Sequence, residues 1–415
     1  MQVSRPQGLG AQLLERFDQR PALASFVVLL TLFLVTASWS LPYHIDPLTN
    51  VLTAWKLGSD GSFIVEEHRA LTGSDYHNVA NQLIATPRGP ISKYPPGASV
   101  LAAPWYVVLD GTELHGVTFN TLTPEGPEER FLEMAIPALW PGSVTAAVTT
   151  AAALAVFAAL ILPVVGNRWA WVGALLVGLG TSLWSVAADS LWQHGPAALW
   201  LMLGIWGFSR SRYLAGSIAF GLAVLTRPQT AIIVAVMGVW AAVRERSLRT
   251  LLAAGAPAAL AATLYVAFNR HFFGSAVDYA AGGYWVEGAA ARSWWGTLEP
   301  MVRAFFDGQR GLLVWSPFVV VGAVAFYRLC KDQPWWLYAA AIAGLIYLVV
   351  QVRGNGYSGG SSFLWYRYQL ETVIAAAPLI VAGLKAAWEN STMWRWAVAA
   401  SCVVAVTAHA VAAVV

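Results

Sequence analysis

The chain has little charge and almost no cysteine. Only 11% of its 415 residues are charged, whereas 57% are hydrophobic, and the mean hydropathy is +0.56. Such a composition leaves too few polar side chains to cover a soluble globule, so it predicts a polytopic membrane protein. The two cysteines, Cys330 and Cys402, offer neither a metal spacing nor a paired framework, which excludes disulfide and thiol chemistry. The net charge of +3 is small and scattered, so nucleic acid is not expected as a partner.

Long apolar runs are what the sequence has in abundance. A helix needs about 20 residues to cross a bilayer, and eleven runs come close to that length. They cover residues 23–41, 134–163, 169–187, 194–209, 213–226, 229–243, 250–269, 311–328, 335–352, 364–384 and 395–413. The first run lacks a small-residue cleavage site, which favours a retained signal anchor. We therefore expect a single all-α polytopic membrane domain, residues 1–415, with about eleven transmembrane helices.

The short loops predict the orientation of these helices. Basic residues recur in every second short connection, on the side of the N-terminus, and the opposite short connections are nearly bare. These residues are Arg5, Arg16, Arg20, Arg168, Arg210, Arg212, Arg244, Arg246, Arg249, Arg328, Lys331 and Lys385. The positive-inside rule then places the N-terminus in the cytoplasm and the C-terminus outside. The expected location of the chain is a plasma (inner) membrane.

Three segments lie outside the expected spans. Residues 1–22 carry apolar side chains at helical spacing and are expected to lie along the cytoplasmic membrane surface. The loops 42–133 and 270–310 are both expected outside. Within the first, the stretches 46–57 and 98–109 are apolar but too short to span, so we expect interfacial helices there. The sequence Tyr94-Pro95-Pro96-Gly97 precedes the second stretch and predicts a rigid turn.

The polar residues with chemical potential gather on the outer side of the predicted topology. They are Asp46, Lys93, Tyr94, Asp189, His194, Arg227, Arg353 and Arg367. Hardly any charge is left for the membrane interior, apart from Glu371, which is close enough to Arg367 on one helix face to pair with it. An ion-coupled transporter usually keeps ionisable residues near the bilayer centre and has repeated halves. We find neither, so the pattern favours a substrate that has a polar head and a long lipid tail.

Several motifs occur together along the chain. An acidic residue, Asp46, follows the first span, and a Tyr-Pro-Pro turn follows in the same loop. Further along stand LTRPQ (225–229), FNRHFFGSAVDYA (268–280), GLLVWSPF (311–318) and GGSSFLWYRYQL (359–370). This ordered set resembles the GT-C superfamily of integral-membrane glycosyltransferases, and within it the branch of protein mannosyltransferases and the aminoarabinose transferase.

The resemblance implies that a sugar is transferred from a polyprenyl-phosphate donor to a lipid, glycan or protein hydroxyl on the outer face. Asp46 would be the catalytic base of an inverting displacement. Lys93, Arg227 and Arg367 would stabilise the departing lipid phosphate, and Tyr94, Asp189 and His194 are further candidates for substrate binding. No cofactor is required, although a divalent metal held by Asp46 with Glu66, Glu67 or Asp75 is conceivable.

Each of these residues also has a purely structural interpretation. Asp46 before Pro47 is a common helix start, Arg367 can pair with Glu371, and Arg227 can lie at the interface with its stem along lipid. Asp189 and His194 can be helix-end residues, and Lys93 with Tyr94 can rim the loop. At the level of the whole protein, a transporter or flippase of lipid-linked saccharides and a non-catalytic membrane scaffold are the alternatives.

Overall fold

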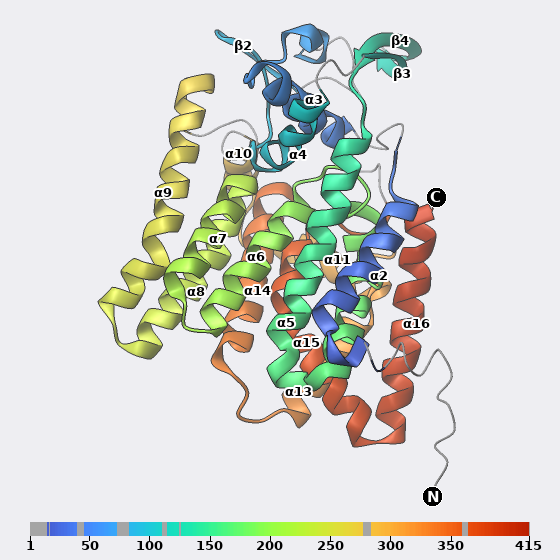
Figure 1. The fold of residues 1–415 in the computed structure, drawn as a ribbon, viewed down its shortest axis with the longest axis vertical. Helices are drawn as coiled ribbons and strands as arrows, with labels where there is room; N and C mark the ends of the chain where they lie inside the picture. The colour runs from blue at the N-terminus through green and yellow to red at the C-terminus, as the bar shows by residue number, and fades with distance from the viewer. Residues whose placement is uncertain are drawn as a thin grey trace, which may run out of the picture.

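The computed structural model describes residues 15, 17–39, 45–72, 83–109, 114–123, 126–276, 284–358 and 364–414. Most of the expected cytoplasmic segment 1–22 lies outside these residues, as does Asp75. The described chain forms a bundle of apolar helices with a smaller polar cap at one end, at the top of Figure 1.

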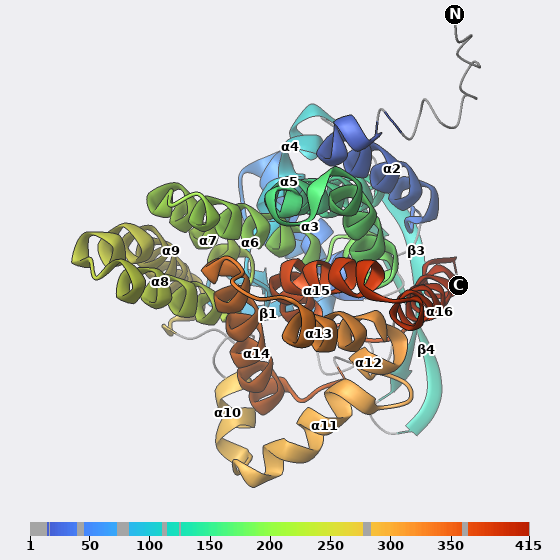
Figure 2. The same ribbon diagram turned by 90° about the horizontal axis from the view of Figure 1, so that it is seen from below.

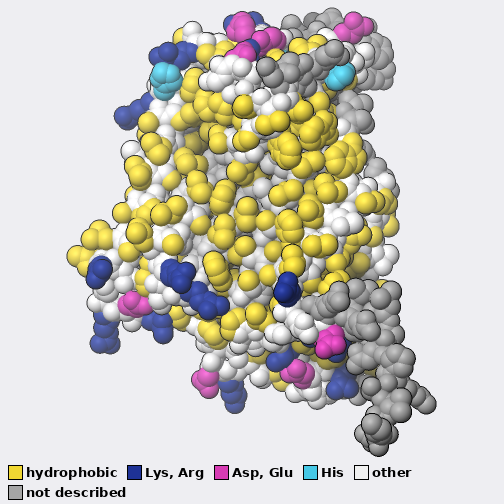
Figure 3. Space-filling model, in the orientation of Figure 1, with side chains coloured by type: hydrophobic (Ala, Val, Ile, Leu, Met, Phe, Trp, Pro, Cys, Tyr) yellow, Lys and Arg dark blue, Asp and Glu magenta, His cyan; other side chains and the backbone are white. Residues whose placement is uncertain are grey.

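Ten helices make up the bundle. They are α2 (Pro21–Thr36), α5 (Trp140–Leu179), α6 (His194–Ser209), α7 (Tyr213–Thr226), α8 (Ala231–Glu245), α9 (Leu248–Phe273), α13 (Phe318–Leu329), α14 (Trp335–Asn355), α15 (Leu370–Asn390) and α16 (Thr392–Val414). The helix α15 packs against α5, α6, α13, α14 and α16 and so forms the centre of the bundle. On the face shown in Figure 3, a broad hydrophobic band covers the bundle, and a group of Lys and Arg side chains lies at the end opposite the cap.

Several of these helices are suited to a bilayer. Within the described residues, five are long and apolar enough to cross a membrane by length and composition, namely α5, α9, α14, α15 and α16. The expectation of about eleven spans is therefore wrong by this measure. The helices α2, α7 and α13 are apolar but have only 16, 14 and 12 residues, and two of the expected spans share the single element α5. The coarser prediction holds: the chain is a multi-pass membrane protein.

Glycine and proline explain where the expected spans were misplaced. Gly166 adopts φ 77° inside α5 and divides this 40-residue element between the two expected spans. Residues 134–136 belong to the strand β4 (Gly126–Ile136), so the second span begins later than expected. Pro317, which has no backbone N–H, separates the short helix α12 (Leu312–Trp315) from α13.

The cap is built mainly from the first long loop. Its helices α3 (Ile45–Asp60) and α4 (Gly97–Val108) confirm the helical stretches predicted there. Two antiparallel hairpins, which the sequence did not suggest, complete it. They are β1 (Leu83–Thr86) with β2 (Gly89–Ser92), in the register Leu83↔Ser92, and β3 (His115–Thr123) with β4, in the register Val117↔Met134. A 3-10 segment, Glu66–Thr72, lies between α3 and β1.

A small core and a hydrogen bond from Asn50 fix the cap on the bundle, and a second hydrogen bond joins α4 to α3 within the cap. Leu48 and Leu52 of α3 are fully buried together with apolar residues of α4 and β4. The Asn50 amide donates to the Leu191 carbonyl over 2.8 Å. The Ser99 hydroxyl of α4 donates to the Asn50 carbonyl over 2.9 Å. The start of α3 is therefore held against the connection that leads from α5 to α6.

The second long loop forms α10 (Tyr284–Ala291), a 3-10 turn at Trp295–Thr297, and α11 (Leu298–Phe306). Figure 2 shows α10 and α11 at the margin of the bundle, beyond α14 and α12. Two further short elements lie in the connections between bundle helices, the π-helical turn Leu183–Ala187 and the 3-10 turn Pro228–Thr230.

Candidate functional site

Asp46 forms a buried ion pair with Arg367, although 321 residues separate them in the chain. Arg367 Nη1 lies 3.0 Å from Asp46 Oδ2, and the two residues are only 8% and 7% exposed. Asp46 stands in the first turn of α3, where the helix dipole favours a negative charge. Arg367 stands just before α15 begins at Leu370. The pair thus joins the cap to the central helix of the bundle.

The two residues before Arg367 explain why it points towards Asp46. Trp365 adopts a left-handed φ of 67°, and its ring stacks on Trp315 with centroids 3.4 Å apart. Its indole N–H donates to the Ala408 carbonyl of α16 over 2.9 Å. The Tyr366 hydroxyl lies 2.7 Å from the Ser316 hydroxyl. These contacts immobilise a sharp turn, so the direction of the Arg367 side chain is set by α12 and α16.

Aromatic rings surround the Arg367 guanidinium. Its central carbon lies 4.6 Å from the Trp192 ring centre and 5.0 Å from that of Tyr368. Nη2 also donates to the Tyr368 hydroxyl over 3.4 Å. An arginine tolerates burial between aromatic faces because its charge is delocalised and its plane stacks on them.

Tyr94 and Lys93 complete the surroundings of Asp46. The Tyr94 phenol hydrogen-bonds the Asp46 carboxylate; burial raises the pKa of Tyr94 well above its usual value, and the charge of Asp46 raises it further. The Lys93 ammonium lies 5.1 Å from the Tyr94 ring centre. Burial lowers the pKa of Lys93, and the Asp46 carboxylate opposes that shift. Tyr94 therefore stays a neutral hydrogen-bond donor to Asp46, and the neighbouring Lys93 ammonium is attracted by the same Asp46 carboxylate.

The turn that carries these two residues is held in place locally. The Ser92 hydroxyl accepts a hydrogen bond from the Tyr94 N–H over 3.0 Å. Gly97 ends the turn against the last residue of α7, where an added Cβ would come within 2.5 Å of the Thr226 Cα. Only glycine permits this approach of the two backbones. The Tyr-Pro-Pro-Gly turn predicted from sequence thus brings Tyr94 and the end of α7 to the same place.

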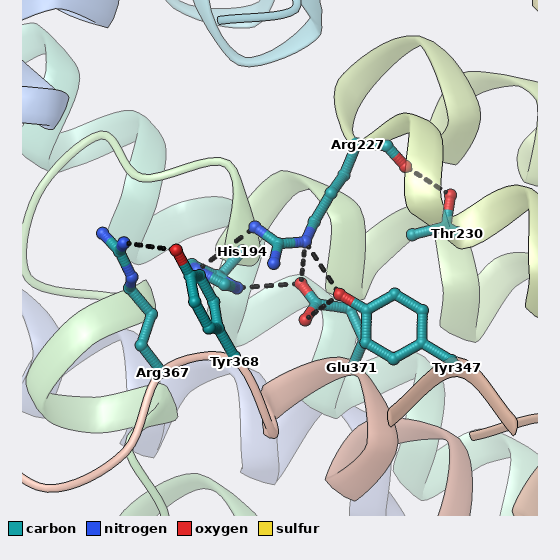
Figure 4. A network of polar contacts seen from close by, with 7 residues as sticks. All are labelled: His194, Arg227, Thr230, Tyr347, Arg367, Tyr368 and Glu371. Carbon is teal, nitrogen blue, oxygen red and sulfur yellow. Dashed lines mark hydrogen bonds and ion pairs between the residues drawn. The ribbon is translucent and has the colours of Figure 1, made fainter. Parts of the chain in front are cut away.

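A second buried network lies beside the first, and Figure 4 shows how its side chains converge on Glu371. His194 Nδ1 lies 2.8 Å from Glu371 Oε1, and Arg227 Nε lies 3.1 Å from the same oxygen. The Tyr347 hydroxyl of α14 donates to Glu371 Oε2 over 3.0 Å. Arg227 Nε also donates to the Tyr347 hydroxyl over 3.1 Å. All four residues are buried.

Local sequence places each member of this network. Pro228 follows Arg227 and holds it in an extended conformation, φ −150°, so that the helix α7 ends there. The Thr230 hydroxyl donates to the Arg227 carbonyl over 2.8 Å and fixes the turn. His194 is the first residue of α6, and Glu371 lies in the first turn of α15. The network therefore joins the cap-side ends of three helices with α14.

The structure corrects the expected partners. Arg367 pairs with Asp46, and Glu371 pairs with Arg227 and His194, so the predicted Arg367–Glu371 pair is wrong. The prediction fails because of the turn at Trp365. Arg367 lies in this turn, outside α15, and therefore does not share a helix face with Glu371. Lys93, Tyr94 and Arg367 are the predicted residues that the structure gathers around Asp46.

Asp189 is the predicted site residue that the structure places elsewhere. Its Oδ1 accepts hydrogen bonds from the Ser38 N–H over 3.0 Å and from the Ser38 hydroxyl over 2.9 Å. This ties the end of α2 to the loop after α5, which supports the helix-end interpretation of Asp189.

Three aromatic residues of the two networks were missed in the sequence: Trp192, Tyr347 and Tyr368. Tyr347 carried the clearest available signal, since it is a polar tip within an apolar helix and a buried tyrosine hydroxyl needs a partner. The Tyr368 hydroxyl accepts a hydrogen bond from Arg367 Nη2, and Figure 4 shows its side chain between Arg367 and the Glu371 network.

The acidic residues considered as metal ligands that the structure describes, Asp46, Glu66 and Glu67, have other partners. Glu66 accepts hydrogen bonds from Arg69 over 2.7 and 2.8 Å, and Glu67 accepts one from Lys56 over 2.5 Å. Within the described part of the chain, no three His, Cys, Asp or Glu side chains come together as a metal site would require.

No protein-family model matches the chain, and no curated protein matches it either. The protein is thus a multi-pass helical membrane protein with two adjoining ionic networks, both buried at the capped end of its bundle.

Proposed function

We propose that the protein is a membrane glycosyltransferase of the GT-C type. It would move a sugar from a polyprenyl-phosphate donor to a hydroxyl of a lipid, glycan or protein acceptor on the extracytoplasmic face of the plasma (inner) membrane. The observation that carries this proposal is the buried Asp46–Arg367 pair, flanked by Tyr94 and Lys93. It combines one potential base with two cations, at the end of the bundle opposite the basic end.

The location of the pair supports a substrate that arrives from the membrane. The positive-inside rule assigns the basic end of the bundle to the cytoplasm and the cap to the outside. Nucleotide sugars are not available outside, so an activated sugar must be carried there by a lipid. A site at the boundary between the apolar band and the cap suits a donor with a charged phosphate head and a long apolar tail.

The residues around Asp46 suit an inverting displacement. The acceptor oxygen would attack the anomeric carbon while its proton passes to an Asp46 carboxylate oxygen. The bond between that carbon and the phosphate oxygen would break, and the electron pair would leave with the lipid phosphate. Arg367 and Lys93 would stabilise the added negative charge. Binding of the donor phosphate to Arg367 would loosen the resting ion pair and release Asp46 to accept the proton.

Arg227 and His194 take a supporting role in this proposal. Both are engaged with Glu371, and a buried charge leaves such a partner only at considerable cost. Their contribution is to fix the ends of α6, α7 and α15 around the site. Tyr368, which accepts a hydrogen bond from Arg367, would help to hold the phosphate-binding Arg367 in place.

Replacement of Asp46 by asparagine tests the proposal. Asp46→Asn keeps the side-chain size and an oxygen acceptor for Arg367 but removes the base. We expect normal membrane insertion and a loss of transfer of about 10²- to 10⁴-fold. Glu67→Gln is the matched control, because Glu67 is an acid of the same loop whose partner is Lys56. Transfer from a labelled polyprenyl-phosphate sugar into the glycolipid fraction is the measurement. Activity of Asp46→Asn equal to that of Glu67→Gln would refute the role of Asp46.

A transporter or flippase of lipid-linked saccharides is the second candidate. The observation that favours it is the His194–Glu371 pair, because buried ionisable pairs within membrane helices often belong to ion pathways. Such a protein would move labelled lipid-linked saccharide across a vesicle membrane without forming a glycosidic bond. Measuring both processes on the same vesicles distinguishes the two candidates.

A further inference from the structure

The second long loop exposes a row of large apolar side chains along α11 and the turn before it. Trp294, Leu298, Val302 and Phe306 recur every four residues and are between 53% and 68% exposed, and Trp295 beside them is 82% exposed. Residues four apart lie on one face of a helix. We call this row, Trp294, Trp295, Leu298, Val302 and Phe306, the α11 stripe. Water contact with so much apolar surface is unfavourable, so the α11 stripe is built to be covered.

The helix that presents the stripe is firmly held. Arg292 Nη1 donates to the Arg353 carbonyl over 2.8 Å and reaches the Val352 and Gly354 carbonyls as well, so it caps the end of α14. The Arg353 guanidinium in turn lies 4.1 Å from the Trp294 ring centre. At the other end of α11, Asp307 Oδ2 accepts a hydrogen bond from the Tyr357 hydroxyl over 3.3 Å. Both ends of α11 are thus attached, and the stripe is a fixed surface.

We propose that the α11 stripe lies in the outer leaflet of the membrane and sets the depth at which the site meets the lipid headgroups. The stripe continues an existing apolar surface, because α11 contacts α12 and α14, which expose Val314 and Leu345. Figure 2 shows α11 at the margin of the bundle, where lipid can reach it. Tryptophan favours the headgroup layer, and the exposed Glu299 and Arg303 offer α11 a polar side for water.

The link from α11 to the site is Gln369. Its amide nitrogen donates to the Ala304 carbonyl of α11 over 3.1 Å, and the residue is fully buried two positions after Arg367. The same amide reaches the Arg310 carbonyl over 3.4 Å. A change in the depth of α11 would therefore shift the segment that carries Arg367. This second part of the inference rests on the proposed function, whereas membrane contact of the stripe does not.

Spin labels on the full-length protein test the membrane contact. In a Cys330→Ala, Cys402→Ala background reconstituted into phosphatidylcholine–phosphatidylglycerol vesicles, labels would be attached to Val302→Cys and, as the control on the same helix, to Arg303→Cys, which lies about 100° further around α11. We expect the label at 302 to collide more with oxygen than with a water-soluble nickel chelate, and the label at 303 to show the reverse. Equal, water-like accessibility at both positions would overturn the contact with lipid, as would protection of 302 from both reagents, which would indicate a protein partner.

Enzyme kinetics test the link to the site. Val302→Asp should raise KM for the polyprenyl-phosphate donor about tenfold, with kcat changed less than twofold, because the chemical groups remain intact. Glu299→Gln should leave both constants unchanged. Unchanged KM in Val302→Asp, together with an immersed label at 302, would overturn the depth-setting role alone. Absence of any transfer by the unaltered protein would instead refute the proposed function and leave the spin-label result standing.

Discussion

The two ionic networks at the capped end of the bundle are built from the same kinds of side chain but differ in closure. Around Glu371, both carboxylate oxygens have partners, and all of these partners come from bundle helices or the link between α7 and α8. Around Asp46, the partners come from a turn of the cap and from the segment before α15, and Lys93 and Tyr94 are half-buried. One network is enclosed by the bundle, whereas the other lies where the cap meets it.

This difference suggests a division of labour. A buried carboxylate whose partners are all fixed is expensive to disturb and is suited to holding helices in place. A carboxylate between a cap and a bundle can exchange partners when a ligand arrives. Because Arg367 stands four residues before Glu371, the rigid network holds the start of the helix that follows Arg367.

The largest effect on stability is expected at Glu371. Glu371→Ala leaves Arg227 buried without its main counter-charge, which should lower the free energy of unfolding by about 3–5 kcal/mol. Unfolding of the detergent-solubilised protein, followed by circular dichroism, is the measurement. Asp46→Asn is the comparison, and it should lower the free energy of unfolding by less, because the amide oxygen still accepts a hydrogen bond from Arg367. If both substitutions destabilise the protein equally, the proposed distinction between a rigid and an exchangeable network is wrong.

The next effect concerns activity at Arg367. Arg367→Gln removes a charge that would stabilise the leaving phosphate, and the loss of one such group should reduce kcat about 100-fold. Arg367→Lys keeps the charge but not the planar guanidinium, so its kcat should lie between that of the wild type and that of Arg367→Gln. Kinetics with a lipid-linked donor would measure this, with Arg303→Gln as a control from the exposed side of α11. An Arg367→Gln enzyme with unchanged kcat would remove Arg367 from the chemistry.

The sequence predicts features that depend on residues close together in the chain better than features that depend on residues far apart. The bounds of α6 and α7 match the predicted runs 194–209 and 213–226, because basic residues and the Arg227-Pro228 pair end them locally. The break at Gly166 lay between two predicted runs for the same kind of reason. The hairpin of β3 and β4 was missed, since its strands read as loop and as the start of a span.

The partners within the site were beyond local rules. Arg367 and Glu371 are four positions apart, a spacing that predicts a pair only if both lie in one helix. Whether the helix starts before or after Arg367 depends on Trp365, whose turn is fixed by contacts with α12 and α16. Asp46 was found as a residue from its place after the first span, but its pairing with Arg367 required the packed structure.

The smallest effect is expected at Asp189, a half-buried carboxylate that accepts hydrogen bonds from serine hydroxyls and from the Ser38 N–H. Burial raises the pKa of Asp189 above its ordinary value of 3.8, and the hydrogen bonds from Ser38 and Ser190 oppose the shift. A raised pKa in the folded state means that the ionised carboxylate reduces stability, and this reduction grows as the pH rises from 3.8 to the raised value. Asp189→Asn removes that cost and keeps an acceptor for Ser38, so stability at neutral pH should change by less than about 1 kcal/mol.

Asp189→Ala is the informative counterpart, because it leaves the Ser38 N–H and hydroxyl without their acceptor. It should lower the free energy of unfolding by about 1–3 kcal/mol at every pH. The free energy of unfolding of Asp189→Asn, minus that of the wild type, should be larger at neutral pH than below pH 3.8. Below pH 3.8 the wild-type carboxyl is neutral, as the asparagine amide is at every pH. Equal losses in the two variants at neutral pH would mean that the charge of Asp189 itself stabilises the end of α2. Asp189, like Glu371, would then be a carboxylate whose charge supports the fold. In that case, the presence of a cationic partner would not be what distinguishes the carboxylates of the two ionic networks from Asp189.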